Sequence, residues 1–81
     1  MDTLILYSKP GCHLCEQAEI LFHAHRGSKR FKLEMKDIAG SDALMERYGI
    51  RIPVIRDPRT GSEIGWPFVE QQLSEFLDSL S

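Results

Sequence analysis

The sequence predicts an α/β domain in which three helices flank a four-stranded mixed sheet. Two observations support this fold class. Apolar runs of strand length alternate with segments whose apolar residues recur at helical spacing, and a turn containing Pro and Gly separates the last two strand-like runs. The expected element order is β-α-β-α-β-β-α. Because the first two strands flank a helix, they should be parallel and joined by a right-handed crossover, whereas the last two should form an antiparallel hairpin.

The first strand and the first helix account for the N-terminal third of the chain. A continuous apolar run at Thr3–Tyr7 is typical of a central strand that is covered on both faces. Ser8–Gly11 should form a loop. A helix should begin at Cys12 and run to about residues 25–26, where Gly27 is well placed to end it. The expected buried face of this helix consists of Leu14, Ala18, Leu21, Phe22 and His25.

A half-buried strand and a short helix should follow. Residues Phe31–Ile38 alternate between apolar and charged side chains, and the lysines suit an edge strand. The side chains expected to point inward are Phe31, Leu33 and Met35, and those expected to point outward are Lys32, Glu34 and Lys36. Ser41 can cap a short helix that ends at Gly49. The apolar residues of this helix are Leu44, Met45 and Tyr48.

The C-terminal part should form a hairpin and a last helix. Ile50–Arg56 is interpreted as a strand with Pro53 inside it, Asp57–Gly61 has the residues of a hairpin turn, and Glu63–Trp66 is a second short strand. Pro67 should open the last helix. The apolar stripe of that helix consists of Val69, Leu73, Phe76, Leu77 and Leu80.

Length and charge restrict the classes of protein to which the chain can belong. Its 81 residues suffice for one small domain over residues 1–81. The net charge is −2 and the charged residues are mixed along the chain, so neither nucleic acid nor a membrane is an expected partner. The apolar stretches are too short to span a bilayer, and Met1–Leu6 lacks the basic start of a signal peptide. We therefore expect a cytoplasmic protein, and we expect it to be monomeric.

The chain has two cysteines, Cys12 and Cys15, at the start of the first predicted helix. At this spacing on a first helical turn, two sulfurs can bond or separate with little movement of the backbone. The unpaired N–H groups and the positive dipole end of the helix favour the thiolate of Cys12, which is the nucleophilic form. A structural disulfide would close too short a loop to add much stability, and the cytoplasm keeps thiols reduced. The pair is therefore interpreted as a redox couple.

A metal site is the main alternative for the cysteines. Zinc usually needs four ligands, and beyond one cysteine pair the chain offers only His13, His23 and His25. His23 and His25 are two residues apart on a helix, so they point to different sides, and His25 shares the apolar stripe. We therefore expect no metal and no bound cofactor within one chain. An iron–sulfur cluster shared between two chains remains open.

Three stretches carry a resemblance to a known family. "LILYSKPGCHLC" leads from a strand through Lys-Pro into the cysteine pair, "RIPVI" contains Pro53, and a hairpin and a helix close the chain. With the element order, these stretches resemble the thioredoxin fold in its minimal, glutaredoxin form. Cys-His-Leu-Cys is similar to the motif of a glutaredoxin-like subgroup.

The resemblance implies a dithiol–disulfide oxidoreductase. Cys12 would attack a substrate disulfide, and Cys15 would resolve the mixed disulfide. Pro53 matches the family's cis-proline, which lies against the cysteines; from the residues alone it could equally start a strand. The remaining candidate substrate-binding residues are Lys9, His13, Arg51 and Ile52. The substrate would be a protein or small-molecule disulfide, and an external thiol would return the electrons.

Glutathione is a candidate reductant, but the sequence departs from the family where glutathione binds. Glutathione-using members have a Gly-Gly turn, followed by a polar residue and Asp, at the start of the last helix. The corresponding stretch here, Ile64–Val69, matches only at Gly65, and Pro67 has no N–H to offer. His13 also replaces the proline that the usual redox members carry after the first cysteine. A non-enzymatic module that binds a metal cluster or a protein partner is therefore the alternative function.

Overall fold

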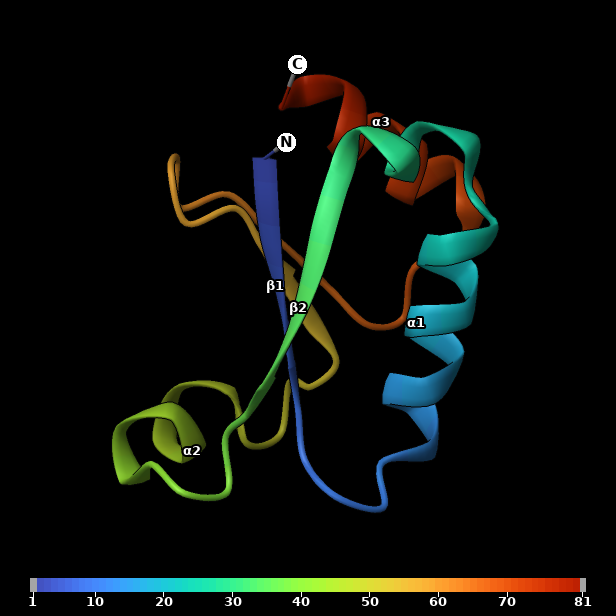
Figure 1. Ribbon diagram of the computed structural model, residues 1–81. Coiled ribbons are helices and arrows are strands. Elements are labelled where there is room, and N and C mark those ends of the chain that lie inside the picture. The colour runs from blue at the N-terminus through green and yellow to red at the C-terminus, as the bar shows by residue number, and fades with distance from the viewer. Residues whose placement is uncertain (1, 81) are drawn as a thin grey trace.

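The computed structural model describes residues 2–80 and confirms the predicted fold class (Figure 1). The elements in chain order are β1 (Asp2–Ser8), α1 (His13–Ala24), a 3₁₀ helix η1 (Arg26–Arg30), β2 (Phe31–Asp37), α2 (Asp42–Tyr48), β3 (Val54–Arg56), β4 (Glu63–Gly65) and α3 (Glu70–Ser79). The four strands form one sheet in the order β2-β1-β3-β4. β1 pairs in parallel with β2 and antiparallel with β3, and β3 and β4 form the predicted antiparallel hairpin.

The main core lies between the sheet and two helices. α1 and α3 lie on one side of the sheet, whereas α2 lies near one end of its other side (Figure 1). Leu4 and Leu6 of β1 are fully buried beneath α1 and α3, as expected for a central strand. The buried residues packed with them are Ala18, Phe22, Phe31, Ile55, Phe68, Leu73 and Leu77. No helix within residues 2–80 is long and apolar enough to cross a membrane.

A smaller cluster lies on the opposite side of β1. The rings of Tyr7 and Tyr48 stack with their centroids 4.2 Å apart, and Ile38 and Val54 pack around them. α2 carries Tyr48 into this position. The helix begins after Ser41, whose hydroxyl accepts the Leu44 N–H, and ends at Gly49, as the sequence predicts.

The first helix differs from its prediction at its end and on one face. The prediction that Gly27 ends α1 is wrong, because Gly27 lies inside η1 and its N–H donates to Nδ1 of His25, 2.9 Å away. His25 is partly buried and closes α1 while it opens η1. Leu14 is 46% exposed rather than buried. The buried row of α1 consists instead of Cys15, Ala18 and Phe22, which recur at steps of three and four.

Two apolar residues of the middle segment are also more exposed than predicted. β2 is an edge strand, as its lysines suggested, and its inward side chains lose cover along its length. Phe31 is buried and Leu33 packs against the core. Met35 is 50% exposed although it pairs with the buried Leu6, because β2 is at the edge of the sheet. Met45 of α2 is also exposed, since the helix contacts the sheet mainly through Tyr48.

The strand predicted at Ile50–Arg56 is shorter than expected and begins only at Val54. The chain turns back after α2 instead of extending, because the N–H groups of Arg51 and Ile52 both donate to the carbonyl of Tyr48. Ile50 is therefore fully exposed. Short local hydrogen bonds thus override the apolar pattern of this segment.

The last helix begins three residues later than predicted. α3 starts at Glu70 rather than at Pro67, because the Val69 N–H donates to the side chain of Gln72, 2.9 Å away, and this bond caps the helix. Val69 is consequently 62% exposed. The inward stripe of α3 consists of Leu73 and Leu77, with Phe76 and Leu80 at its margin.

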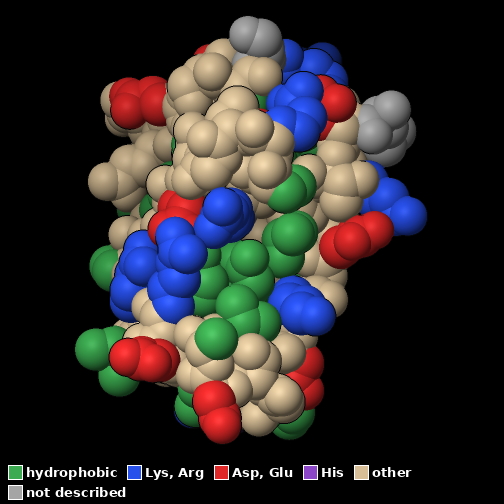
Figure 2. Space-filling model, turned by 90° about the vertical axis from the view of Figure 1, so that its left-hand side faces the viewer, with side chains coloured by type: hydrophobic (Ala, Val, Ile, Leu, Met, Phe, Trp, Pro, Cys, Tyr) green, Lys and Arg blue, Asp and Glu red, His purple; other side chains and the backbone are tan. Residues whose placement is uncertain are grey.

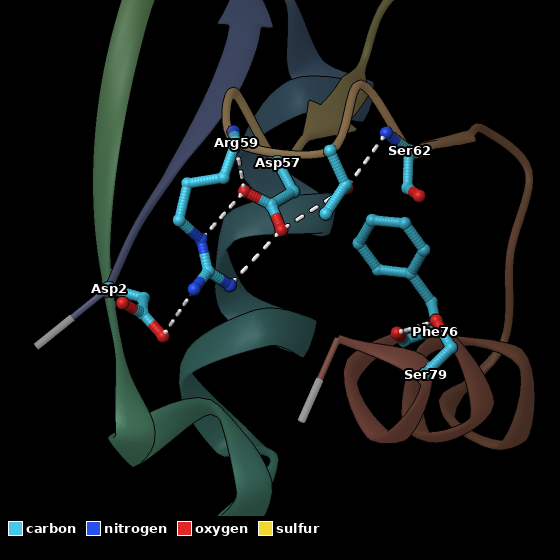
Figure 3. Close-up of polar contacts among 7 residues, drawn as sticks. Asp2, Asp57, Arg59, Ser62, Phe76 and Ser79 are labelled. Carbon is cyan, nitrogen blue, oxygen red and sulfur yellow. Dashed lines mark hydrogen bonds and ion pairs between the residues drawn. The ribbon is translucent and has the colours of Figure 1, made fainter.

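The hairpin turn is organised around the buried carboxylate of Asp57 (Figure 3). One carboxylate oxygen accepts the N–H of Arg59 at 2.9 Å, and the other accepts its guanidinium at 3.2 Å and the Thr60 hydroxyl at 3.3 Å. The Arg59 guanidinium also reaches Asp2 at the start of β1, 3.2 Å away. Gly61 closes the turn at φ +80°, a conformation that favours glycine. The predicted turn is therefore confirmed, with the buried carboxylate as its centre.

We predict that Asp57→Asn lowers the free energy of unfolding by about 1–3 kcal/mol, because a neutral amide replaces a buried, charged acceptor among three donors. Urea unfolding at neutral pH measures the change. Asp42→Asn is the matched control: its carboxylate is exposed, and the expected change is within about 0.5 kcal/mol. Equal losses in the two variants would contradict the prediction.

The same carboxylate should make stability depend on pH. Burial alone raises the pKa of Asp57, but hydrogen bonds from Arg59, the charge of Arg59 and the Thr60 hydroxyl hold it below its ordinary value of 3.8. Because the folded-state pKa is depressed, the stabilisation is present above pH 3.8 and is lost as the pH falls through the folded-state value. Wild type should therefore lose more stability than Asp57→Asn between neutral and strongly acidic pH, as measured by thermal unfolding.

Candidate functional site

Three loops meet at one end of the sheet. Tyr7 near the end of β1 pairs with Val54 at the start of β3, and Val54 pairs with Gly65 at the end of β4. The loop after β1, the segment before β3 and the segment after β4 therefore emerge side by side. These segments are residues 9–12, residues 49–53 and residues 66–69. The first holds Cys12, the second Pro53 and the third Pro67.

The two cysteines are joined by a disulfide bond, with their Cα atoms 5.3 Å apart. Cys12 is the N-cap of α1, and its sulfur accepts the N–H of Cys15 at 3.1 Å. Cys12 is partly exposed, whereas Cys15 is 2% exposed in the first turn of the helix. A donor and a helix N-terminus directed at one sulfur stabilise negative charge on it. The geometry thus distinguishes an accessible sulfur that can carry charge from a shielded one.

The loop before Cys12 is shaped by its backbone. Gly11 has φ +80°, which few other residues adopt without strain, and the Cys12 N–H donates to the carbonyl of Lys9 at 3.2 Å. The side chain of Lys9 is exposed, and so is that of His13, whose Nδ1 lies 3.6 Å from a carboxylate oxygen of Glu16. The structure therefore places both predicted substrate-binding residues in the chain on either side of Cys12, in contact with solvent.

The Ile52–Pro53 segment lies at the same end of the sheet. Pro53 is buried, and its peptide bond with Ile52 is cis, as is the bond between Trp66 and Pro67. The carbonyl of Pro53 accepts the Trp66 N–H at 3.0 Å, which joins the second and third loops. The Ile52 N–H donates to the carbonyl of Tyr48 at 3.0 Å, so this donor is already engaged.

Arg51 is held by a carboxylate that the sequence did not single out. Its guanidinium donates to Glu63 of β4 at 3.2 Å. The other oxygen of Glu63 accepts the Tyr48 hydroxyl and lies 3.6 Å from Arg56. Burial raises the pKa of Glu63, but the hydrogen bonds from Tyr48 and Arg51 and the neighbouring arginine charges lower it below its ordinary value. We call this set, Tyr48, Arg51, Arg56 and Glu63, the Glu63 cluster.

One signal in the sequence could have revealed the Glu63 cluster. Arg56 and Glu63 are directly opposite in the β3–β4 hairpin, and opposite charges at such positions attract. Finding the pair needs the hairpin register, which follows from the turn at residues 57–61. The contribution of Arg51 could not be found in this way, because it depends on the turn that replaces the predicted strand.

The structure offers no assembled metal site among residues 2–80, where no three His, Cys, Asp or Glu side chains lie close enough together to hold a metal ion. His23 and His25 lie at the end of α1, away from the cysteines at its start. Nδ1 of His25 is occupied by the Gly27 N–H.

Comparisons with known proteins find one matching family model and solved structures that resemble this chain. Residues 3–78 match the model of the family described as Glutaredoxin-like domain (DUF836). The X-ray structure of the structural genomics target XcR50 from X. campestris is 37% identical, covers 94% of this chain and 96% of its own, and has a TM-score of 0.81. The solution structure of that target is also 37% identical, covers 98% and 95% and has a TM-score of 0.79. No curated protein matches the sequence.

The family match includes every part of the site. It begins in β1 and ends in α3, so it contains both cysteines and all three loops at the end of the sheet. The solved structures extend the similarity over nearly the whole chain at a sequence identity well above that expected of a shared fold alone. The chain therefore belongs to the glutaredoxin-like domain family.

Proposed function

We propose that this protein is a cytoplasmic dithiol–disulfide oxidoreductase that acts through Cys12 and Cys15. The observation that carries the proposal is the asymmetry of the pair. The sulfur of Cys12 is accessible, caps α1 and accepts the Cys15 N–H, whereas Cys15 is buried behind it. Membership of the glutaredoxin-like family supports thiol redox chemistry on this fold.

The reaction proceeds in two exchange steps. The Cys12 thiolate attacks one sulfur of a substrate disulfide, a mixed disulfide forms, and the other substrate sulfur leaves as a thiolate that takes up a proton. The Cys15 thiolate then attacks the sulfur of Cys12, which releases the second substrate thiol and forms the Cys12–Cys15 disulfide. Two electrons have passed to the substrate. Two equivalents of an external thiol, or one dithiol, reduce the pair again.

The surroundings of Cys12 favour the reopening of its disulfide as well as the attack. An external thiol attacks the accessible Cys12 sulfur, and Cys15 leaves. A second thiol then attacks the outer sulfur of the resulting mixed disulfide, and Cys12 leaves readily because the N–H of Cys15 and the N-terminus of α1 stabilise charge on its sulfur. Lower basicity costs some nucleophilicity, with a Brønsted slope of about 0.4–0.5, so the gain in attack is modest. The larger effect is on the leaving step.

The substrate would lie along the Ile52–Pro53 segment. Pro53 has no N–H, and that of Ile52 is engaged by Tyr48, so backbone pairing with the substrate falls to the Ile52 carbonyl. Lys9 and His13 offer exposed polar contacts beside Cys12. Arg51 remains 46% exposed although it is bound to Glu63, so its free edge can still contact a substrate carboxylate.

We predict that alkylation of the reduced protein at mildly acidic pH labels Cys12 at least about tenfold faster than Cys15, because thiolate character and exposure control the rate. Mass spectrometry of digests after timed quenching measures both rates. A rate for Cys15 equal to or above that of Cys12 would reverse the assignment of the attacking thiol.

Serine variants of the two cysteines should separate the two exchange steps. Cys12→Ser should abolish disulfide exchange while α1 remains capped, because a serine hydroxyl also accepts the N–H. Cys15→Ser should accumulate mixed disulfides through Cys12, since the resolving thiol is gone. Non-reducing gels and intact mass detect these adducts. Adducts on Cys15 in Cys12→Ser, at the rate seen on Cys12, would contradict the mechanism.

Glutathione should be a poor reductant for this protein. In the third loop the Trp66 N–H donates to Pro53, Pro67 has no N–H, and the Val69 N–H donates to Gln72, so few backbone donors remain for a ligand. The Asp of the family's glutathione turn is also absent. We predict lower turnover with glutathione and its reductase than with thioredoxin and its reductase, at equal enzyme. Turnover by glutathione at the higher rate would overturn this prediction.

A further inference from the structure

One face of the sheet is covered at only one end. Side chains alternate along a strand, and directly paired residues point to the same face. The registers therefore place Ile5 of β1, Glu34 of β2 and Arg56 of β3 on the face opposite α1 and α3. α2 covers the Tyr7 end of this face, whereas Ile5 remains partly exposed. We call the exposed side chains of this whole face, including those beside Tyr48 at its covered end, the open sheet face.

The open sheet face is cationic in an acidic protein. The strands place Lys32, Lys36 and Arg56 on it together with Glu34 and Glu63. Two further guanidiniums, those of Arg47 and Arg51, each lie 5.4 Å from the ring centroid of Tyr48. Five cations and two carboxylates give these seven side chains a net charge of +3. The whole chain carries −2, so its remaining residues carry −5.

The charges are arranged in two rows. Figure 2 shows hydrophobic side chains at the centre of a face with Lys and Arg side chains on both sides. β2 and β3 lie on either side of β1, so the lysines of β2 and Arg56 of β3 are about 10 Å apart across the sheet. That width accommodates one extended chain lying along β1, with cations within reach on each side.

We propose that the open sheet face docks a protein partner through an acidic segment of that partner, and that the partner carries the disulfide exchanged at Cys12. The second part rests on the proposed function. Charge complementarity selects an acidic occupant and accelerates its encounter. A nucleic acid fits less well, because its affinity comes mainly from many phosphate contacts and the face offers only five cations with two carboxylates among them.

The open sheet face lies near the redox site along β1, with Tyr7 and the end of α2 between them. Ile5 is three residues before Ser8, where β1 ends, which is about 10 Å along the strand, and the loop to Cys12 follows directly. Arg51 is two residues before Pro53 and belongs to both surfaces. A spacer of about six extended residues, spanning roughly 20 Å, therefore suffices to join an acidic segment on β1 to a disulfide at Cys12.

The binding experiment uses the whole protein and two synthetic cysteine-free peptides, one rich in Asp and Glu and the other with Asn and Gln in their place. Titration followed by amide chemical shifts should show saturable binding of the acidic peptide alone. Shifts should concentrate at Thr3, Ile5, Lys32 and Lys36, and binding should weaken as salt is added. Absence of binding, or shifts confined to α1 and α3, would overturn the proposal.

Two double variants provide a matched comparison of charge position. Lys32→Glu/Lys36→Glu reverses two charges on the open sheet face, and Arg26→Glu/Lys29→Glu reverses two on η1, so both proteins have a net charge of −6. Affinity for the acidic peptide should fall about tenfold, equal to about 1.4 kcal/mol, in the first and by less than twofold in the second. Equal losses would show that net charge alone is responsible and would overturn the proposal.

A kinetic experiment connects docking to turnover. The two peptides are extended by a Gly/Ser spacer and a small disulfide loop, and kcat/KM is measured for each. Wild type should reduce the acidic substrate about tenfold faster, and Lys32→Glu/Lys36→Glu should lose that preference while still reducing the amide substrate. Peptide binding without turnover of either substrate would count against the proposed function and leave the docking face supported. Turnover without charge preference would refute the docking face alone.

The same titration tests two other possible occupants of the open sheet face, a nucleic acid and a second copy of this chain. A single-stranded oligonucleotide that binds more tightly than the acidic peptide would assign the face to nucleic acid instead. Concentration-dependent shifts of these amides without peptide would assign it to a second copy, whose other surfaces are acidic. Either result would overturn the proposal.

Discussion

The central position of β1 is the constraint on which the rest of the structure depends. Leu4 and Leu6 are fully buried on one face, and Tyr7 stacks on Tyr48 on the other. A shift of one residue in its pairing would exchange these faces, so the register is strongly specified. The same register aligns Tyr7, Val54 and Gly65 across three strands and so brings the cysteine loop beside the other two. The site is thus a consequence of strand pairing.

The Glu63 cluster attaches the Pro53 segment to this frame. Side chains from α2, the following turn and the β3–β4 hairpin converge on one carboxylate that is 17% exposed. Burial raises the pKa of Tyr48, and its hydrogen bond to Glu63 raises it further, so the phenol remains a donor at neutral pH. The backbone N–H groups of Arg51 and Ile52 also donate to the carbonyl of Tyr48. The segment before Pro53 is therefore held both by its backbone and by the side chain of Arg51. Preorganisation of this kind suits the role in substrate binding that we propose for this segment.

Local chemistry made most of the fold predictable from the sequence. The cap at Ser41, the stop at Gly49 and the turn at residues 57–61 depend on nearby residues, and all three are confirmed. The errors arose where distant packing or a competing hydrogen bond decided the outcome. Leu14 and Met35 fit their periodic patterns but lie at the margin of the core and are about half exposed.

The candidate site was also predictable where nearby residues determine it and unpredictable where distant residues do. The cysteine spacing, the preceding loop and Pro53 are local features of the sequence, whereas the role of Glu63 appears only when the hairpin register brings it to Arg51. The open sheet face could not be predicted from the hairpin register alone, because it also depends on which helix covers which part of the sheet. The mixed charges along the chain concealed it, because only strand pairing brings cations from separate segments onto one face.

Trp66, the chain's one tryptophan, has a practical consequence for the study of this molecule. Its backbone N–H donates to the carbonyl of Pro53, and its ring packs edge-on against Phe68 with centroids 5.2 Å apart. Indole emission therefore arises from the end of the sheet where the three loops meet and from nowhere else in the protein. The chain therefore contains an intrinsic optical reporter of the end of the sheet that holds its two cysteines, without an attached label.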